Sequence, residues 1–598
     1  MPGRRQASSV QSHRRRKARR YRLAIAPWIV ISAVAVLLLS GVTAGYAWLA
    51  QQGCKGAPTT LSVVADPDHA KILSSLAQQW TQKNPEIGGS CAAVSVASTK
   101  SGDVAGTLSP TWDPKRDGPR PDVWAPDSST WIRVAQARPE AYSMFPTLQP
   151  SIARSPVVIA MPRPMALSLG WPNAPIDWRS LVTTFTGSHS WKDFKHPEWG
   201  NFQIGMTDPT KSTAGLEALL AITDYNDDEQ ISQDELNHTS DLAKEVTRYT
   251  PDSDSMFGAL QMADTQGKAL QYVSAFPALE RDVSDYNQTS PQVPLVAVYP
   301  KSGTADADFP YLVLNAPWVG AKQKQIAAAF LSFVQGPVGH KAYADAAFRG
   351  PDRSASPQLT EARGFQPKIA VSARMALLPD SITRTVVTWT ALRRTVNALA
   401  VVDASGSMAD NAPGGQGSKL QLAEQAAEHA VGLFNDQSEL GLWEFSTQRT
   451  DSTDYKELVP IGPITASVGG DTRRAAVTTA LKGLTAKGGT GLYNTALAAY
   501  KAAQAAYQPN RVNLVLLLTD GKNEATTSDL TKSQLLTQLR SVADSSRPVE
   551  IITIAYGRDA DSTALKDIST ATGGREYTSL DPNSIDTVLL TALFGSST

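Results

Sequence analysis

The chain of 598 residues begins with one long apolar stretch and then changes to a different hydrophobic pattern. No charged residue occurs between Arg22 and Lys55, and residues 23–50 read LAIAPWIVISAVAVLLLSGVTAGYAWLA. About 20 consecutive apolar residues cross a bilayer as a helix, so residues 23–50 are predicted to form one transmembrane helix. From about residue 59 onward, short apolar runs alternate with amphipathic segments, which is typical of α/β domains.

Basic residues are concentrated before this apolar stretch. Residues 1–22 contain nine Lys/Arg and no acidic residue. The positive-inside rule therefore predicts a basic cytoplasmic tail over residues 1–22, a single-pass anchor in the cell membrane, and an extracytoplasmic location for the bulk of the chain. A nucleic-acid-binding arm is the alternative, but topology already accounts for these charges, and no nucleic-acid partner is expected. Signal-peptide cleavage after Val42-Thr43-Ala44 also stays open, although the apolar run is long for that purpose.

The two cysteines, Cys54 and Cys91, both follow the membrane helix and are therefore predicted to lie outside, where thiols oxidise. Each is expected just before a strand of one parallel βαβ unit, which would bring the two strand starts together. We predict a Cys54–Cys91 disulfide. Two free buried thiols are the alternative.

The first unit outside the membrane is predicted over residues 55–355. A strand at 61–64 and a strand at 94–97 flank an amphipathic helix at 69–82. The run ARSPVVIAMP has the composition of a strand that leaves this lobe, and VPLVAVYP has that of a returning strand. A chain that crosses out and back encloses a second lobe, here residues 163–292.

The segments of this unit resemble, in order, the extracellular solute-binding protein family, in the branch of molybdate- and sulfate-type binding proteins. The resemblance is carried by TLSVVADPDHAKILSSLAQQW, PDVWAPDSSTWI, SPVVIAMPRP, GMTDPTKSTAGL and LVAVYPKSGT. It implies a two-lobed periplasmic-binding-protein-like (type II) domain that holds a small-molecule solute between its lobes at helix N-termini. The ligand residues implied are Ser98, Thr99, Ser101, Thr210, Ser212 and Thr213.

Two features limit that implication. Any one of these hydroxyls, Ser212 or Thr213 above all, can instead cap the helix that follows it. Asp66-Pro67-Asp68 also departs from the family pattern, because oxyanion-binding members usually offer a hydroxyl after the first strand. A carboxylate at that place would repel an anion, so the solute is not identified.

An acidic segment inside the second lobe, DYNDDEQISQDE, matches the spacing of an EF-hand calcium loop. Glu229 stands where the loop expects glycine, and a solvated acidic connection is the alternative. If Ca²⁺ binds here, the predicted ligands are Asp224, Asn226, Asp228, Gln230, Ser232 and Glu235.

The chain after this unit divides again. Residues 356–394 begin with a polar segment containing Pro and Gly and continue with SITRTVVTWTALRRT, which is predicted to be helical, so they are interpreted as a linker. In residues 395–598, a buried strand at 397–402 ends on Asp403-Ala404-Ser405-Gly406-Ser407, and a second buried strand at 512–519 ends on Asp520. Carboxyl ends of parallel strands meet at one edge of a doubly wound sheet, where such folds bind ligands.

These residues, with Thr490 after two glycines, resemble the metal-ion-dependent adhesion site (MIDAS) of von Willebrand factor type A (VWA) domains. The resemblance implies a doubly wound, Rossmann-like domain over residues 395–598. Two carboxylates and three hydroxyls suit Mg²⁺ or Mn²⁺. The resemblance further implies that a protein partner completes the coordination with an acidic residue. Helix capping by the serines explains neither Thr490 nor Asp520. The site is expected in a solvated crevice; the implied metal ligands are Asp403, Ser405, Ser407, Thr490 and Asp520.

The combined features favour a surface adhesion or scaffolding receptor that engages its partner through the metal. A solute sensor or a transport-associated solute-binding protein is the alternative. An enzyme is not expected, because HExxH, GxSxG and P-loop motifs are absent and the seven histidines are scattered along the sequence.

Overall fold

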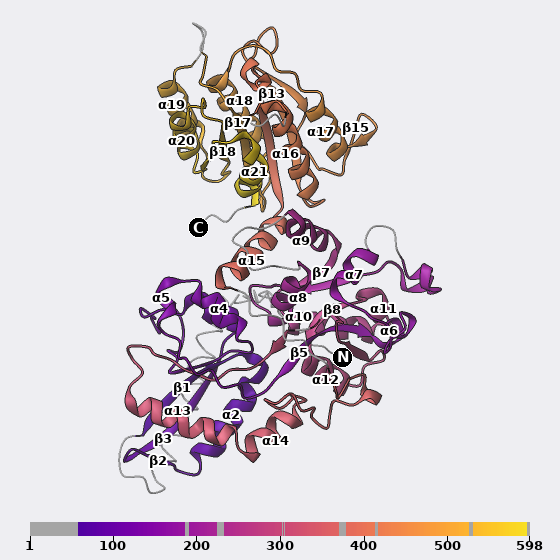
Figure 1. Ribbon diagram of the computed structural model, residues 1–598, viewed down its shortest axis with the longest axis vertical. Coiled ribbons are helices and arrows are strands. Elements are labelled where there is room, and N and C mark those ends of the chain that lie inside the picture. The colour runs from indigo at the N-terminus through magenta and orange to yellow at the C-terminus, as the bar shows by residue number, and fades with distance from the viewer. Residues whose placement is uncertain are drawn as a thin grey trace, which may run out of the picture.

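The computed structural model of the protein describes residues 58–185, 190–223, 233–301, 303, 305–369, 378–412, 417–524 and 530–594. The predicted cytoplasmic tail and membrane helix lie outside these residues. Within them, no helix combines the length and the apolar character needed to cross a membrane. Figure 1 shows a two-lobed unit and a separate C-terminal unit. The predicted α/β architecture of two units is confirmed.

The first lobe is built on a five-stranded sheet in the order β11-β4-β1-β3-β2. Its central strand β1 pairs in parallel with both β3 and β4. Helix α2 begins after β1 because Asp66 accepts a hydrogen bond from the Asp68 N–H and Pro67 occupies the first turn. The elements are β1 (Thr59–Ala65), α2 (Pro67–Thr81), β2 (Glu86–Ile87), β3 (Ser90–Ser98), α3 (Ser101–Thr107), β4 (Val123–Ala125), α4 (Thr130–Gln136), α5 (Pro139–Tyr142), β11 (Leu312–Val313), α13 (Ala321–Val334) and α14 (Pro337–Asp345).

The second lobe is entered and left by two antiparallel neighbours, β5 and β9, as the sequence predicts. β5 also pairs with β8 and β10, and β6 pairs in parallel with β7. The elements are β5 (Ser155–Pro162), α6 (Arg163–Ser168), α7 (Trp178–Phe185), β6 (Ile204–Thr207), α8 (Thr213–Ile222), α9 (Gln233–Glu245), β7 (Val246–Thr250), α10 (Ser253–Thr265), α11 (Ala269–Tyr272), β8 (Phe276–Leu279), α12 (Glu280–Gln288), β9 (Leu295–Val298) and β10 (Asp306–Ala307).

Helix α15 (Pro379–Arg393) confirms the predicted helical end of the linker and lies between the two units (Figure 1). It packs against α4 of the first lobe, α8 and α9 of the second lobe, and α21 of the C-terminal unit. Ile382 belongs to a core cluster of first-lobe residues that also includes Leu216 and Leu220 of α8, whereas Leu392 belongs to the core of the C-terminal unit. This part of the linker is therefore a packed helix that contacts both lobes and the C-terminal unit.

The C-terminal unit is a six-stranded sheet in the order β14-β13-β12-β17-β18-β19, parallel except for the edge strand β14. Alternate residues of β12 enter two separate cores: Ala398 and Val402 face α16, α17 and α21, whereas Leu399 and Val401 face α18, α19 and α20. Helices thus cover both faces, and the predicted doubly wound fold is confirmed. The elements are β12 (Val396–Asp403), α16 (Lys419–Leu433), β13 (Glu439–Phe445), β14 (Tyr455–Val459), β15 (Ser467–Val468), β16 (Asp471–Thr472), α17 (Arg473–Lys482), α18 (Leu492–Ala505), β17 (Val512–Thr519), α19 (Lys532–Val542), β18 (Glu550–Tyr556), α20 (Ser562–Ala571), β19 (Glu576–Ser579) and α21 (Ile585–Phe594).

Candidate functional sites

The first candidate site lies at the carboxyl edge of the C-terminal sheet, where the neighbouring parallel strands β12 and β17 end. Asp403 is the last residue of β12, and Asp520 directly follows β17. The Ser407 hydroxyl donates a hydrogen bond to Asp520 Oδ1 at 2.7 Å. It also lies 3.1 Å from Ser405 Oγ, in the turn that follows Asp403. The tight turn after β12 therefore presents the Ser407 hydroxyl to Asp520 and places the Ser405 hydroxyl beside it.

Thr490 reaches the same place from the segment before α18. A Cβ atom built on Gly521 would lie 2.5 Å from Thr490 Oγ1, which is closer than real contacts allow. The absence of a side chain at position 521 thus lets the Thr490 hydroxyl approach the backbone beside Asp520. All five residues predicted to hold the metal converge here.

The oxygen spacing suits a small, hard cation. Neighbouring ligands of an octahedral Mg²⁺ lie about 3.0 Å apart when each bond is about 2.1 Å long. The Ser405–Ser407 and Ser407–Asp520 oxygen separations of 3.1 and 2.7 Å are close to that value. The donor set present in this edge therefore fits Mg²⁺ or Mn²⁺.

The expectation of a solvated crevice is wrong for four of the five residues, because Asp403, Asp520, Ser405 and Thr490 are all buried. Asp403 is fully buried. Its Oδ1 accepts the Ser405 N–H at 2.7 Å, and its Oδ2 accepts the Thr519 hydroxyl. Burial raises the pKa of Asp403 to about 6, since the ionised form loses water. The strand end holds this carboxylate below the surface, so its replacement is expected to affect stability.

Lys419, which motif spacing does not single out, contacts the same site. Its Nζ lies 2.8 Å from Asp520 Oδ2, and the residue is only 8% exposed. It begins α16 immediately after the capping residue Ser418. Asp520 thus presents Oδ1 to Ser407 and Oδ2 to the ammonium group, which leaves the Oδ1 side for a metal ion.

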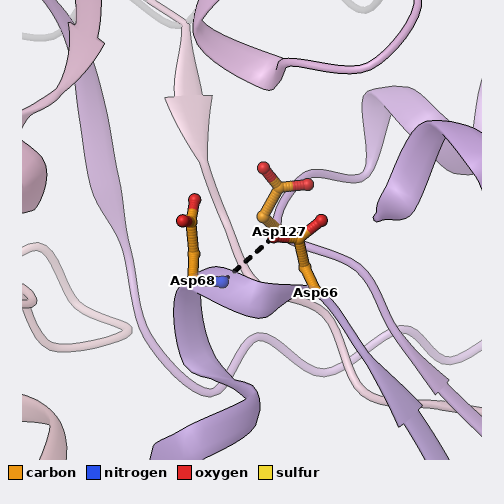
Figure 2. Close-up of side chains that lie close together, drawn as sticks. All are labelled: Asp66, Asp68 and Asp127. Atoms are coloured by element: carbon orange, nitrogen blue, oxygen red, sulfur yellow. Dashed lines mark hydrogen bonds between the residues drawn. The ribbon is translucent and has the colours of Figure 1, made fainter. Parts of the chain in front are cut away.

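The second candidate site is the cleft between the two lobes, where three aspartates gather (Figure 2). Asp66 follows β1, Asp68 lies in the first turn of α2, and Asp127 follows β4, the parallel neighbour of β1. Carboxylate oxygens of the three residues lie within 4.8 Å of one another. The carboxyl ends of adjacent strands therefore place negative charge where related folds bind ligands.

Hydrogen bonds hold Asp66 in place. Its Oδ2 accepts the Ser101 N–H at 2.8 Å and the Ser101 hydroxyl at 2.7 Å, and its Oδ1 accepts the Asp68 N–H at 3.1 Å. Burial, together with the charges of Asp127 and Asp68, nevertheless raises the pKa of Asp66 well above its usual range. Burial and the charge of Asp68 also raise the pKa of Asp127 to about 7. Three carboxylates this close, with Asp66 and Asp127 buried and Asp68 partly exposed, destabilise one another's ionised forms.

Comparison with known families accounts for both units. Residues 61–349 match the family of bacterial extracellular solute-binding proteins, and residues 398–590 match the von Willebrand factor type A domain. The chain carries a solute-binding domain followed by a VWA domain. Two uncharacterized proteins of Mycobacterium tuberculosis, from strains CDC 1551 and H37Rv, are each 25% identical to it over 544 residues, which is 87% of this chain and 74% of theirs.

Two solved structures are each similar to one of the two domains. A periplasmic thiamin binding protein has a TM-score of 0.38 and 13% identity, over 56% of this chain and 95% of its own. A von Willebrand factor type A protein from Catenulispora acidiphila has a TM-score of 0.26 and 20% identity, over 33% of this chain and 42% of its own.

Only two of the six hydroxyl residues predicted to bind solute line the cleft of the solute-binding domain. Ser212 and Thr213 line the cleft, whereas the described lining residues do not include Ser98, Thr99, Ser101 or Thr210. Ser212 caps α8 by accepting the Gly215 N–H, as the capping alternative proposes. Thr213 accepts the indole N–H of Trp131 at 2.6 Å. Both therefore have structural roles at the cleft wall.

Asp127 was not singled out by sequence reasoning. The signal existed, because Asp127 follows a buried strand just as Asp66 does. The run before Asp127 is apparent in the sequence, but nothing in the sequence shows that β4 lies next to β1 in the sheet, and only this pairing brings Asp127 close to Asp66.

Two sequence predictions depend on residues that the structure does not describe. Of the predicted calcium loop, Asp224, Asn226, Asp228, Gln230 and Ser232 lie outside the described residues, and Glu235 is buried in α9. Cys91 lies in β3 and is not free. Its predicted partner Cys54 lies outside the described residues, so the bridge stays a prediction.

Proposed function

We propose that this protein is a membrane-anchored, extracytoplasmic, non-enzymatic binding protein whose VWA domain engages a protein partner through a divalent metal ion. The observation that carries the proposal is the oxygen cluster at the ends of β12 and β17, with spacings of 2.7 and 3.1 Å. Asp403, Ser405, Ser407, Thr490 and Asp520 would hold Mg²⁺ or Mn²⁺, as in the VWA metal site that they resemble.

The charge around this site supports recognition of an acidic partner. A bound cation supplies a Lewis-acidic position that a carboxylate from outside can complete. Lys419 adds a second positive charge beside Asp520, so the two aspartates do not leave the site strongly negative once a divalent ion binds. An acidic side chain of a partner is therefore attracted by both the ion and the ammonium group.

The proposal predicts that partner capture requires the metal. We expect cross-linking to full-length protein, solubilised from membranes, to capture a partner in Mg²⁺ and to lose it in chelator. Asp520→Ala should lose capture in both conditions, whereas Asp471→Ala, at an exposed position of β16, should behave as the parent protein. Capture that is equal with and without chelator would contradict a metal-dependent contact.

A second role, a solute sensor, is supported by helix α15. This helix packs against both lobes and against α21 of the VWA domain, so a change in lobe closure has a direct mechanical route to the second domain. The Arg393 guanidinium lies 4.0 Å from the Tyr249 ring and 5.3 Å from the Trp389 ring, which fastens α15 to β7. In this role, a small solute in the cleft would alter what the VWA domain binds.

The sensor role predicts that α15 is held firmly in the full-length protein. Arg393→Ala removes a cation–π contact of about 1 kcal/mol, so amide hydrogen exchange in α15 should become about fivefold faster. Arg540→Ala in α19, which touches neither junction, serves as the control. Exchange of α15 amides in the parent protein at the rate of an unfolded chain would contradict the coupling.

A further inference from the structure

We infer that the cleft of the solute-binding domain binds a hard divalent cation of the size of Ca²⁺, held by Asp66, Asp68 and Asp127. This inference names the ligand class for the second proposed role and rests on that role only in taking the cleft as a ligand site. The inference is tested by cation titration and uses neither the capture of a protein partner nor hydrogen exchange in α15. Failure of the inference can therefore be told apart from failure of either proposed function.

The carboxylate spacing is the first support. Oxygens of the three aspartates lie within 4.8 Å of one another. Ca²⁺ binds oxygen at about 2.3–2.6 Å, so ligands on opposite sides of the ion are up to about 5 Å apart. A single Ca²⁺ can therefore contact one oxygen from each carboxylate without a large rearrangement. Mg²⁺, with bonds of about 2.1 Å, requires a tighter cage.

The second support is an unsatisfied oxygen within the same cluster. Asp127 is only 4% exposed. Burial raises the pKa of its carboxyl group and hydrogen bonds from the Thr213 and Ser101 side chains lower it, yet its Oδ1 has no hydrogen-bond partner among the described residues. It lines the cleft together with Asp66 and Asp68, and Figure 2 shows the three carboxylates raised on the same side of the α2 N-terminus. A buried carboxylate oxygen without a partner is costly. A cation in the cleft would supply the missing contact.

Two basic side chains near the three aspartates form their shortest ion pairs with other acidic residues. Lys100 forms an ion pair with Asp252 across the cleft. Arg281 approaches Asp68 at 3.7 Å but is closer to Asp282, at 2.7 Å, and also pairs with Asp285.

Lys211, an exposed residue, also lines the cleft, and two further acidic residues, Asp252 and Asp254, line it as well. The described lining residues thus include five aspartates against two lysines. This balance disfavours an oxyanion and favours a cation.

The composition of the walls favours a metal ion over an organic amine. Organic ammonium groups are commonly held against aromatic faces, and the described lining residues of the cleft include no aromatic side chain. They offer carboxylates and hydroxyls, the oxygen ligands that hard cations prefer. The walls therefore provide coordination but little apolar surface for an organic body.

The test is calorimetric titration of the full-length protein with Ca²⁺, in excess Mg²⁺ so that the VWA site is occupied. Asp127→Asn keeps the side-chain shape and should weaken binding at the cleft by about tenfold or more, as should Asp68→Asn. Asp345→Asn, an exposed residue of α14, should bind Ca²⁺ as the parent protein does. Glu235→Ala removes a predicted ligand of the acidic segment before α9. Any Ca²⁺ heat that this variant loses is therefore assigned to that segment and not to the cleft.

Three results would overturn the inference. One is a Ca²⁺ titration in which Asp127→Asn and Asp68→Asn match the parent protein while all three are folded by circular dichroism. Another is complete loss of the Ca²⁺ heat in Glu235→Ala, which would place the ion at the acidic loop. The third is binding of spermidine, used as a probe of organic amines, by a protein that binds neither Ca²⁺ nor Mn²⁺ in the cleft.

Discussion

Replacement of Asp403 by alanine is expected to weaken Mg²⁺ binding to the VWA domain by about 100-fold or more. Asp403 supplies one of only two carboxylates in the oxygen cluster, so alanine removes half of the negative charge that attracts the ion. Loss of groups that merely support metal ligands already weakens binding by about 10–100-fold, and a direct ligand should matter more. Partner capture should fall with the metal.

The stability of the fold should also change, because Asp403 is buried. In the absence of metal, alanine leaves the Ser405 N–H and the Thr519 hydroxyl without their acceptor, which costs about 1–3 kcal/mol for such groups. It also removes a carboxylate whose pKa burial raises to about 6, and this change stabilises the fold near neutral pH. Asp403→Asn retains an acceptor oxygen without the charge. It should therefore be the more stable variant while it also binds Mg²⁺ poorly.

The measurements are Mg²⁺ titration by calorimetry and thermal unfolding in chelator, with Asp471→Ala as the matched control. Unchanged Mg²⁺ affinity in both Asp403 variants would show that the cluster is not the metal site. Loss of folding in Asp403→Ala together with normal Mg²⁺ affinity in Asp403→Asn would indicate a purely structural role.

Asp127→Asn is expected to raise the stability of the cation-free protein at pH 8 by up to about 4 kcal/mol. Burial raises the pKa of Asp127 from 3.8 to about 7, and each pKa unit corresponds to about 1.4 kcal/mol. Since the folded-state pKa lies above the unfolded one, the contribution of Asp127 to stability is fully present below pH 3.8. It is lost as the pH rises through 7. Asparagine does not ionise, so its advantage should appear at pH 8 and disappear toward pH 4.

Thermal unfolding of parent and variant in chelator across this pH range measures the difference, which should amount to several degrees at pH 8. Asp345→Asn, whose side chain is exposed, should show no comparable pH-dependent gain. Excess Ca²⁺ should stabilise the parent protein and reduce the advantage of Asp127→Asn, because a ligand that binds only the folded state adds stability. An equal melting temperature for parent and variant at pH 8 would contradict the strain assigned to this carboxylate.

The sequence alone was sufficient for the residues of the candidate metal site to be named and for their convergence to be expected. β12 and β17 are almost wholly buried, so they appear in the sequence as continuous apolar runs, and each run ends on an aspartate. Neighbouring parallel strands end at the same edge of a sheet, which makes the approach of Asp403 and Asp520 a consequence of local pattern. The crossing and return of β5 and β9 were predictable for the same reason, because both are buried runs of distinct length and composition.

Only the tertiary structure decided the electrostatic surroundings of both sites. Lys419 meets Asp520 across 101 residues of sequence, and no periodicity relates a helix-starting lysine to a distant strand end. The depth of Asp403 and the unsatisfied oxygen of Asp127 depend on how much of each carboxylate the neighbouring elements cover. Helix α15 is likewise recognisable as a helix from its sequence, whereas its contacts with three bodies depend on their arrangement. Local sequence determines which groups stand at strand and helix ends, but burial and charge pairing arise from distant segments, because solvent exclusion is a property of the assembled fold.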